Sequence, residues 1–464
     1  MLIQLSRHAF VRHFGNMSEV INQRNDAKFW LQDAEPFLRF IDRTPRKEEE
    51  IIRDIAGVYG CPPEDVAEDF RAFAENISGA LLRGETEAEL STQEPEFRYY
   101  TRQEAEAETA RSVSLSVERS QETDNFSDSG INDFLIAHRQ ISSLHIDLTD
   151  GCTERCVHCY VPEYGTKTLS FDAVCKVLKE YRDMGGLEVE LSGGEPMCHP
   201  QFREILRYAR NCDLMITVLS NLTVLDEKTV KTLSDVRIKY LQTSVYSMIP
   251  EVHDAITQRP GSFAETMRGI ALMREYDVPM KINTPVLKEN FGSWRTVEEF
   301  CADQNYKFSS NASLLARVNH DCGNLDHGLS AAQMHSYLSS CQSSNPWGPG
   351  TFNKQPDDPM CEVCTIKLRL DAAGNYYPCV AGRGLVLGNC HKVTIREAWN
   401  SELAEKLRAL KQRDFPECFQ CKSRCFCLAC PAANFNETGD LYRHRPEYCM
   451  EPKIKYQLCK EKSC

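Results

Sequence analysis

The chain has 464 residues and a mass of 52.9 kDa, and 26% of its residues are charged. This length predicts two to four domains, because one hydrophobic core rarely grows beyond about 250–300 residues. No apolar run is long enough for a membrane span, the start has no signal-peptide core, and a net charge of −13 argues against nucleic-acid binding. We therefore expect a cytoplasmic protein without membrane or nucleic-acid partners.

Cysteine is unusually frequent, with 22 residues. A secreted chain with this content would carry a disulfide framework. In the reducing cytosol, thiolate ligation of a metal is the better expectation. The spacing of the cysteines then has to indicate which metal they bind.

Residues 1–84 are predicted to form a small α/β module. Short alternating apolar runs predict strands, and apolar residues at helical spacing predict two helices that follow them. The expected strands are Leu2–Leu5, Phe10–Phe14, Val20–Asn22 and Ala27–Leu31, and the expected helices are Pro45–Tyr59 and Pro63–Leu82.

Residues 85–140 are predicted to be an acidic linker. Between residues 85 and 130 there are 12 acidic residues and 4 arginines, with few apolar side chains. Such a like-charge excess is typical of a mobile, solvated segment. A docking surface for a partner is the alternative.

From residue 141 to about 320, strands and helices alternate, which predicts a parallel sheet that is either doubly wound or part of a barrel. We assign residues 141–345 to this domain. One expected helix, Phe171–Met184, follows a candidate N-cap at Ser170. The expected strands are Leu144–Leu148, Glu188–Leu191, Met215–Leu219, Tyr240–Val245, Met280–Thr284 and Ser313–Ala316.

A first cysteine group follows the first of these strands, as Cys152-Thr-Glu-Arg-Cys156-Val-His-Cys159. Three thiolates in one loop can wrap one face of an iron–sulfur cube and leave one iron uncovered. Structural zinc normally takes four closed ligands. His158 could complete a zinc site, but simultaneous ligation by the adjacent Cys159 would be strained.

This C-x3-C-x2-C loop resembles the signature of the radical S-adenosylmethionine (SAM) superfamily. Gly193-Gly194-Glu195-Pro196 after the second strand resembles that family's GGEP motif. The resemblance implies a partial (β/α)6 barrel, a [4Fe–4S] cluster on the three cysteines, and SAM bound at the uncovered iron. It also implies that reductive cleavage of SAM yields a 5′-deoxyadenosyl radical that abstracts a substrate hydrogen.

The same resemblance implies the SAM-binding residues. A Gly-Gly turn permits a close approach of backbone atoms to the SAM methionine. Serine hydroxyls at the strand ends would bind the ribose or the carboxylate, and the residue before the third cysteine would lie beside the adenine. The implied set is His158, Gly193, Gly194, Glu195, Pro196, Ser220, Asn221 and Ser244.

A second cysteine field, in residues 346–464, resembles the SPASM domain, which carries two auxiliary [4Fe–4S] clusters. The resemblance assigns Cys361, Cys364, Cys379 and Cys430 to the first cluster, and Cys418, Cys421, Cys427 and Cys449 to the second. The spacing near Cys427 departs from the family pattern and leaves Cys425 as a competing ligand. Two four-cysteine zinc sites are the structural alternative.

Residues 1–84 resemble the peptide-binding, winged-helix-like recognition element of enzymes that mature ribosomally made peptides (RiPPs). In that family a leader peptide adds a strand beside the third strand. Here the implied contacts are Lys28, Phe29, Trp30 and Leu31. A dimerisation or purely structural domain is the alternative.

Together these resemblances imply a radical SAM maturase that binds the leader and core of a precursor peptide and forms thioether cross-links. A flavodoxin- or ferredoxin-type protein would supply electrons, and three [4Fe–4S] clusters would be bound. The alternatives are a carbon–carbon cross-linking cyclase, a sulfatase-maturase-like oxidase and, outside enzymes, a zinc-stabilised peptide-binding adaptor. No catalytic base is evident in the sequence.

Overall fold

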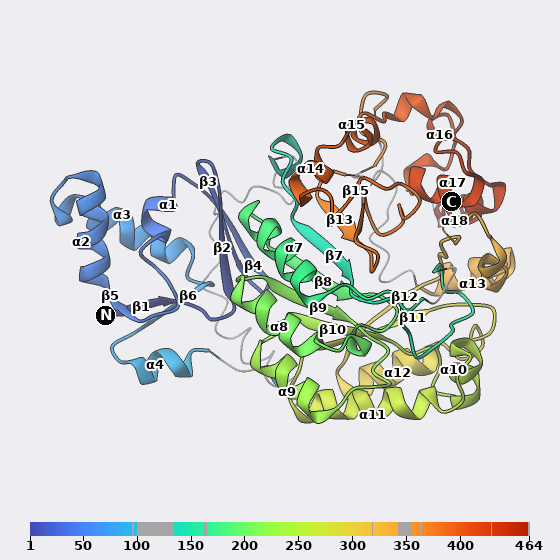
Figure 1. Ribbon diagram of the computed structural model, residues 1–464, viewed down its shortest axis with the longest axis horizontal. Coiled ribbons are helices and arrows are strands. Elements are labelled where there is room, and N and C mark those ends of the chain that lie inside the picture. Colours follow the sequence, from blue (N-terminus) through green and yellow to red (C-terminus); the bar gives the residue numbers. More distant parts are fainter. Residues whose placement is uncertain are drawn as a thin grey trace.

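The computed structural model describes residues 1–94, 97–99, 134–161, 165–317, 319–341, 355–361, 364–427 and 429–462. Three parts follow one another along the chain: an N-terminal module, a central α/β part and a C-terminal part (Figure 1). Among the described helices, none is both long enough and apolar enough to cross a membrane. Most of the predicted acidic linker lies outside the described residues.

The N-terminal module contains two small antiparallel sheets and four helices. One sheet has the order β5-β1-β6 and the other the order β2-β3-β4. The strands are β1 (Leu2–Leu5), β2 (Ala9–Phe14), β3 (Met17–Asn22), β4 (Ala27–Gln32), β5 (Arg46–Lys47) and β6 (Leu81–Gly84), and the helices are α1 (Glu35–Leu38), α2 (Glu48–Tyr59), α3 (Pro63–Asn76) and α4 (Glu87–Thr92).

These elements confirm the four predicted strands. The first predicted helix begins later than expected, at Glu48, because Arg46 and Lys47 form strand β5, and it ends at Gly60 in the left-handed conformation (φ 66°). The second predicted helix was too long. It ends at Asn76, and Leu81 and Leu82 lie in strand β6, paired with β1. The apolar spacing of Leu81 fits either element locally, and the long-range pairing with β1 decides between them.

The module packs directly on the central part. Arg12 of β2, which is 2% exposed, donates from Nε to the carbonyl of Gly186 at 2.8 Å and from Nη1 to Asp213 at 3.0 Å. Phe10 and Ile21 form a buried cluster with Leu187 and Met215. Helix α4 (Glu87–Thr92) lies within the range expected for the linker, residues 85–140.

The central part is a parallel sheet whose helices follow their strands, as predicted. Ser170 caps α7 by accepting a hydrogen bond from the backbone of Ala173. The strands are β7 (Ser143–Asp147), β8 (Glu188–Ser192), β9 (Met215–Leu219), β10 (Tyr240–Ser244), β11 (Met280–Pro285) and β12 (Lys307–Asn311), and the helices are α7 (Phe171–Asp183), α8 (Phe202–Asn211), α9 (Glu227–Asp235), α10 (Pro250–Thr257), α11 (Ser262–Glu275) and α12 (Arg295–Gln304).

The sixth strand was predicted at the wrong place. Ser313–Ala316 has no regular structure, and β12 lies at Lys307–Asn311, in register with β11. Its sequence, KFSSN, has one apolar residue, so it shows no strand pattern. Backbone pairing with β11 forms this strand rather than burial of an apolar face.

The C-terminal part continues the central sheet. Strand β13 (Lys367–Leu370) pairs in parallel with β7, and the sheet order is β12-β11-β10-β9-β8-β7-β13-β14-β15. Apolar side chains of β7, β13 and α14 share one core that includes Leu144, Leu368 and Trp399. The remaining elements are β14 (Asn375–Tyr377), β15 (Gly388–Asn389), α13 (Ala331–Ser340), α14 (Ile395–Trp399), α15 (Glu402–Arg408), α16 (Pro416–Phe419), α17 (Pro431–Thr438) and α18 (Met450–Lys462), with 3-10 turns at Pro196–Cys198, Gly323–His327, Gln412–Asp414, Arg424–Phe426 and Pro446–Cys449.

Candidate cluster and cofactor sites

The first cysteine loop begins at the carboxyl end of β7 and is anchored on α10. The backbone N–H of Arg155 donates to the carbonyl of Thr257, and that of Val157 to the carbonyl of Ile256, both at 2.9 Å. Cys152, Cys156 and Cys159 are half-buried in this loop. The motifs that follow β8 and β9 lie at the same edge of the sheet, because these strands are parallel to β7.

Two of the three thiols, those of Cys152 and Cys156, lie in surroundings that disfavour free thiolates. Burial raises the pKa of Cys152 to about 12, and the charges of Glu195, Glu154 and Cys159 contribute further. Burial, and then Glu154 and the other two thiols, raise the pKa of Cys156. Metal binding deprotonates thiols, so this donor set suits a positively charged iron centre that supplies the missing charge.

The Gly193–Gly194 turn packs against the cysteine loop. Gly193 has φ +138°, and a Cβ atom there would lie 2.4 Å from the carbonyl oxygen of Thr149; at Gly194 it would lie 2.3 Å from that of Gly151. The N–H of Gly194 donates to the carbonyl of Thr149 at 2.7 Å. The close approach seen at this turn is to the protein's own backbone. Contact with SAM stays a prediction.

Glu195 joins this turn to the end of β9. It is fully buried, and its carboxylate accepts hydrogen bonds from the backbone N–H groups of Met197 (3.0 Å) and Asn221 (2.8 Å) and from the hydroxyl of Ser220 (2.8 Å). Burial raises the pKa of Glu195 to about 7. Glu195 and Ser220 thus hydrogen-bond to each other, and Glu195 holds the Gly193–Gly194 turn against the end of β9.

Asn221 and Ser244 complete the predicted residues at this edge. The side-chain amide of Asn221 donates to the hydroxyl of Thr153 at 2.9 Å, inside the cysteine loop. Ser244 is the last residue of β10 and lies in register with Asn283 of β11. Pro196 is buried at the start of a 3-10 turn.

His158 contacts a residue that sequence reasoning missed. Its Nε2 lies 2.9 Å from the hydroxyl of Tyr246, and this hydroxyl lies 3.7 Å from Sγ of Cys156. Burial lowers the pKa of His158 to about 4, so the imidazole is neutral at pH 7. Tyr246 lies two residues beyond Ser244, and only the fold brings it to the cysteine loop.

The eight predicted auxiliary ligands fall into two spatial groups. Burial raises the pKa of Cys364 to about 12, with contributions from Cys379 and Cys361, and that of Cys379 to about 11, with a contribution from Cys430. Burial likewise raises the pKa of Cys427 to about 12, with contributions from Cys418, Cys449 and Cys421. These interactions lie within the two sets that the resemblance implies, and the assignment of the ligands to clusters stays a prediction.

The grouping favours Cys427 over Cys425, because the thiol of Cys427 interacts with all three other members of its set. Within the part of the chain that the structure describes, no three His, Cys, Asp or Glu side chains form a preformed site for a single metal ion. The cluster assignments rest on the grouping of the thiols and on their chemistry.

Strand β4 provides a free backbone edge on the N-terminal module, since in the described sheet it pairs only with β3. The N–H of Asp33 donates to the carbonyl of Asn16 at 2.7 Å. In an antiparallel ladder the backbone groups of every second residue point toward the partner strand, so this bond fixes which residues of β4 do so. The backbone groups of Phe29 and Leu31 therefore point toward β3, and those of Lys28 and Trp30 point toward the free edge.

Comparisons with known proteins agree with this architecture. Residues 146–301 match the Radical SAM superfamily, and residues 361–425 match SPASM, an iron-sulfur cluster-binding domain. The chain contains a radical SAM domain followed by a SPASM domain. Cys427, Cys430 and Cys449 lie beyond the matched SPASM residues. SAM and [4Fe–4S] clusters are the cofactors of these two domains.

Two curated relatives resemble different shares of the chain. An AdoMet-dependent heme synthase of Methanosarcina barkeri is 25% identical over 336 residues, which cover 66% of this chain and 95% of the relative. The subtilosin biosynthesis protein AlbA of Bacillus subtilis is 32% identical over 148 residues, which cover 31% of this chain and 33% of AlbA. The match to AlbA thus spans about a third of its length.

Two solved structures have a similar fold. SuiB of Streptococcus suis, bound to S-adenosylmethionine, has a TM-score of 0.59 at 15% identity and covers 96% of this chain and 99% of SuiB. The structure of anSMEcpe with bound AdoMet has a TM-score of 0.55 at 17% identity and covers 69% of this chain and 94% of anSMEcpe. At these identities the likeness concerns the fold alone.

Proposed function

We propose that this protein is a radical SAM maturase that modifies a ribosomally made precursor peptide and joins a cysteine sulfur to a carbon by a thioether bond. The observation that carries the proposal is the free edge of β4, in a module packed on a radical SAM barrel. An extended leader peptide can add a strand at such an edge, where backbone hydrogen bonds supply affinity. The core segment of the peptide would then reach the barrel.

Similarity to peptide-modifying proteins supports this choice. A match covering 96% of 464 residues leaves about 19 outside it, so the SuiB match takes in most of the N-terminal module. SuiB has also been crystallised with its precursor peptide SuiA, and AlbA is a protein of bacteriocin biosynthesis. The match to the heme synthase covers 66% of this chain, a smaller share than the match to SuiB covers. This difference favours a peptide substrate over a haem precursor.

The ligands follow from the grouped thiols. Cys152, Cys156 and Cys159 would hold the SAM-binding cluster, and two SPASM sets would hold two auxiliary clusters, making three in all. When bound and reduced, the first cluster and SAM supply the 5′-deoxyadenosyl radical, with electrons from a flavodoxin- or ferredoxin-type donor. Glu195, with its three protein donors, and Tyr246 hold the cysteine loop and the surrounding strand ends in place.

The thioether step balances with these components. One carbon–hydrogen and one sulfur–hydrogen bond break, and one carbon–sulfur bond forms. The hydrogen atom would leave with 5′-deoxyadenosine and the thiol proton would go to solvent, while an auxiliary cluster would serve as the acceptor of the remaining electron. The peptide therefore loses two hydrogens for each cross-link.

Carbon–carbon cross-linking is the second candidate, because PqqA peptide cyclase of Gluconobacter oxydans is 29% identical over 151 residues. Both reactions remove two hydrogens, but only thioether formation consumes a cysteine thiol. Alkylation of the product with iodoacetamide therefore separates the two.

The test is co-expression of this protein with each short open reading frame beside its gene, followed by mass spectrometry of the peptides. We expect a peptide lighter by two hydrogens per cross-link and resistant to alkylation at the linked cysteines. Co-expression with the Cys152→Ala, Cys156→Ala, Cys159→Ala triple variant is the control and should leave the peptide unmodified. A lighter peptide that still alkylates at every cysteine would favour carbon–carbon linkage, and an unmodified peptide in all pairs would contradict a maturase.

A further inference from the structure

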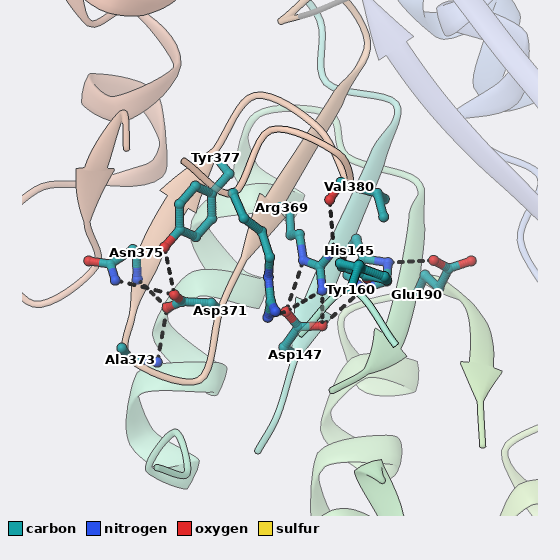
Figure 2. Close-up of polar contacts among 11 residues, drawn as sticks. His145, Asp147, Tyr160, Glu190, Arg369, Asp371, Ala373, Asn375, Tyr377 and Val380 are labelled. Carbon is teal, nitrogen blue, oxygen red and sulfur yellow. Dashed lines mark hydrogen bonds and ion pairs between the residues drawn. The ribbon is translucent and has the colours of Figure 1, made fainter. Parts of the chain in front are cut away.

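A buried group of charged residues lies between the cysteine loop and the SPASM strand β13, and the proposed reaction does not use it. We call His145, Asp147, Glu190, Arg369 and Arg383 the Asp147 cluster, and the first four of these residues are labelled in Figure 2. His145 and Asp147 belong to β7, Glu190 to β8 and Arg369 to β13, so three neighbouring strands of one sheet contribute.

Asp147 is the centre of the cluster and is fully buried. Arg369 donates to it from Nε at 2.8 Å and from Nη2 at 2.8 and 2.6 Å. Arg383 donates to the same carboxylate at 2.5 Å, and Nε2 of His145 lies 3.1 Å from it. Nδ1 of His145 lies 2.5 Å from the carboxylate of Glu190.

Arg369 extends from this pair to two loops. Its Nη1 donates to the hydroxyl of Tyr160 at 2.9 Å and to the carbonyl of Val380 at 3.0 Å. With the contacts to Asp147, all three nitrogens of the guanidinium have hydrogen-bond partners. The guanidinium carbons of Arg369 and Arg383 also lie 5.6 and 5.8 Å from the centre of the Tyr160 ring.

Tyr160 and Val380, the two loop partners of Arg369, are sequence neighbours of predicted cluster ligands. Tyr160 directly follows Cys159, the last cysteine of the first loop, and Val380 directly follows Cys379 of the first auxiliary set. One rigid side chain therefore holds the residue next to a ligand of each cluster. A guanidinium suits this role, because its planar donors fix direction as well as distance.

We infer that Arg369 is a positioning residue that locks the loop ending at Cys159 to the loop beginning at Cys379, and so sets how the SAM-binding cluster lies relative to the first auxiliary cluster. The inference rests on the cluster assignments of the proposed function. Asp147 orients Arg369 from β7, and Arg383 neutralises the same carboxylate from the Cys379 loop. A displacement of about 1 Å between reacting groups can lower a rate about a hundredfold.

The test is hydrogen–deuterium exchange of the anaerobically reconstituted holoenzyme, with no peptide present. Arg369→Gln removes the charge and most of the bonds, and Arg369→Lys keeps the charge without the planar fork. In both variants we expect exchange in residues 152–161 and 378–384 to become about tenfold faster. The electron paramagnetic resonance signal of the first auxiliary cluster should change, and that of the second should not.

Arg12→Gln is the matched control. Arg12 is equally buried, its side chain being 1% exposed as is that of Arg369, and it binds Gly186 and Asp213 far along the sequence from both cysteine loops. It should lower the melting temperature without faster exchange in the two loops. If Arg12→Gln and Arg369→Gln loosen these loops equally, Arg369 is only a structural residue and the inference fails.

Tyr160→Phe keeps the test valid if the arginine variants do not fold. It removes one hydroxyl and leaves the Asp147–Arg369 pair in place. We expect faster exchange in residues 152–161 alone, and unchanged exchange there would overturn the inference. Because no peptide is used, failure of this experiment is distinct from failure to find a modified peptide.

Discussion

Asp147 combines full burial with ion pairs to two guanidinium groups, and it contributes to stability as well as to loop position. Although burial opposes ionisation, Arg369, His145 and Arg383 hold the pKa of Asp147 well below its usual range. A carboxylate with a lowered folded-state pKa stabilises the protein above its unfolded pKa of about 4, and this contribution is lost as the pH falls.

Asp147→Asn should therefore destabilise the protein at pH 7. Removing one partner of a buried ion pair costs about 3–5 kcal/mol, because the remaining charge is left unpaired. Melting temperatures of the anaerobic holoprotein at pH 7 and pH 4 would measure this effect. Because the contribution of Asp147 is lost only well below pH 4, we expect the gap between wild type and variant to be nearly as large at pH 4 as at pH 7, and an equal melting temperature at pH 7 would contradict the role of the pair.

Cys425 and Cys427 provide a direct comparison of two adjacent candidate ligands. The thiol of Cys427 interacts with those of Cys418, Cys421 and Cys449. We expect Cys427→Ala to lose about four irons per chain and Cys425→Ala to retain them, because loss of one of four ligands opens a [4Fe–4S] cluster. Iron analysis after anaerobic reconstitution gives the answer, and the reverse result would move the assignment to Cys425.

Strand β4 shows how pairing decides which residues can accept a peptide. Its sequence predicts a strand. The pairing with β3 determines that the backbone N–H and C=O of Lys28 point toward the free edge and those of Phe29 point toward β3. A proline at Phe29 would thus break the pairing with β3 and disturb the module itself. A proline at Lys28 removes a donor only from the free edge.

We expect Lys28→Pro to weaken leader binding about tenfold or more, since an added strand loses a backbone hydrogen bond and the edge loses its regular geometry. Lys28→Ala is the control that keeps the N–H group and should bind within about threefold of wild type. Fluorescence anisotropy with the leader of the precursor found by co-expression measures both affinities. Circular dichroism checks the fold, and equal affinities in the three proteins would place the leader elsewhere.

The three parts of the chain form one connected structure, through the Arg12 contacts just before β8 and β9 and through the pairing of β13 with β7. Removal of residues 1–84 would expose Leu187 and Met215, which Phe10 and Ile21 now cover. Point changes on β4 are for this reason a cleaner test of peptide recognition than deletion of the module.

The proposed clusters of the whole protein predict its iron content. Three [4Fe–4S] clusters correspond to about twelve irons per chain, and the Cys152→Ala, Cys156→Ala, Cys159→Ala triple variant should retain about eight. This variant should form no 5′-deoxyadenosine from SAM under reducing conditions. A zinc-loaded, iron-poor C-terminal half would contradict the auxiliary clusters, and 5′-deoxyadenosine from the triple variant would contradict the radical mechanism.

The sequence by itself indicated the domains and the grouping of the cysteines. Ligand spacing and apolar periodicity are local properties, so the cysteine loop, the Gly193–Gly194 turn and the strands β7 to β11 could be predicted from neighbouring residues. The same local reasoning failed for β12 and for the end of α3, where pairing with a distant strand determines the structure.

Only the tertiary structure brought together the residues that no spacing connects. Asp147 and Arg369 are 222 positions apart, and they meet because β13 joins the sheet beside β7. Tyr246 reaches Cys156 in the same way, from the next segment beyond β10. A buried ion pair has no periodic signature in the sequence, since its partners are selected by the closure of the fold around them.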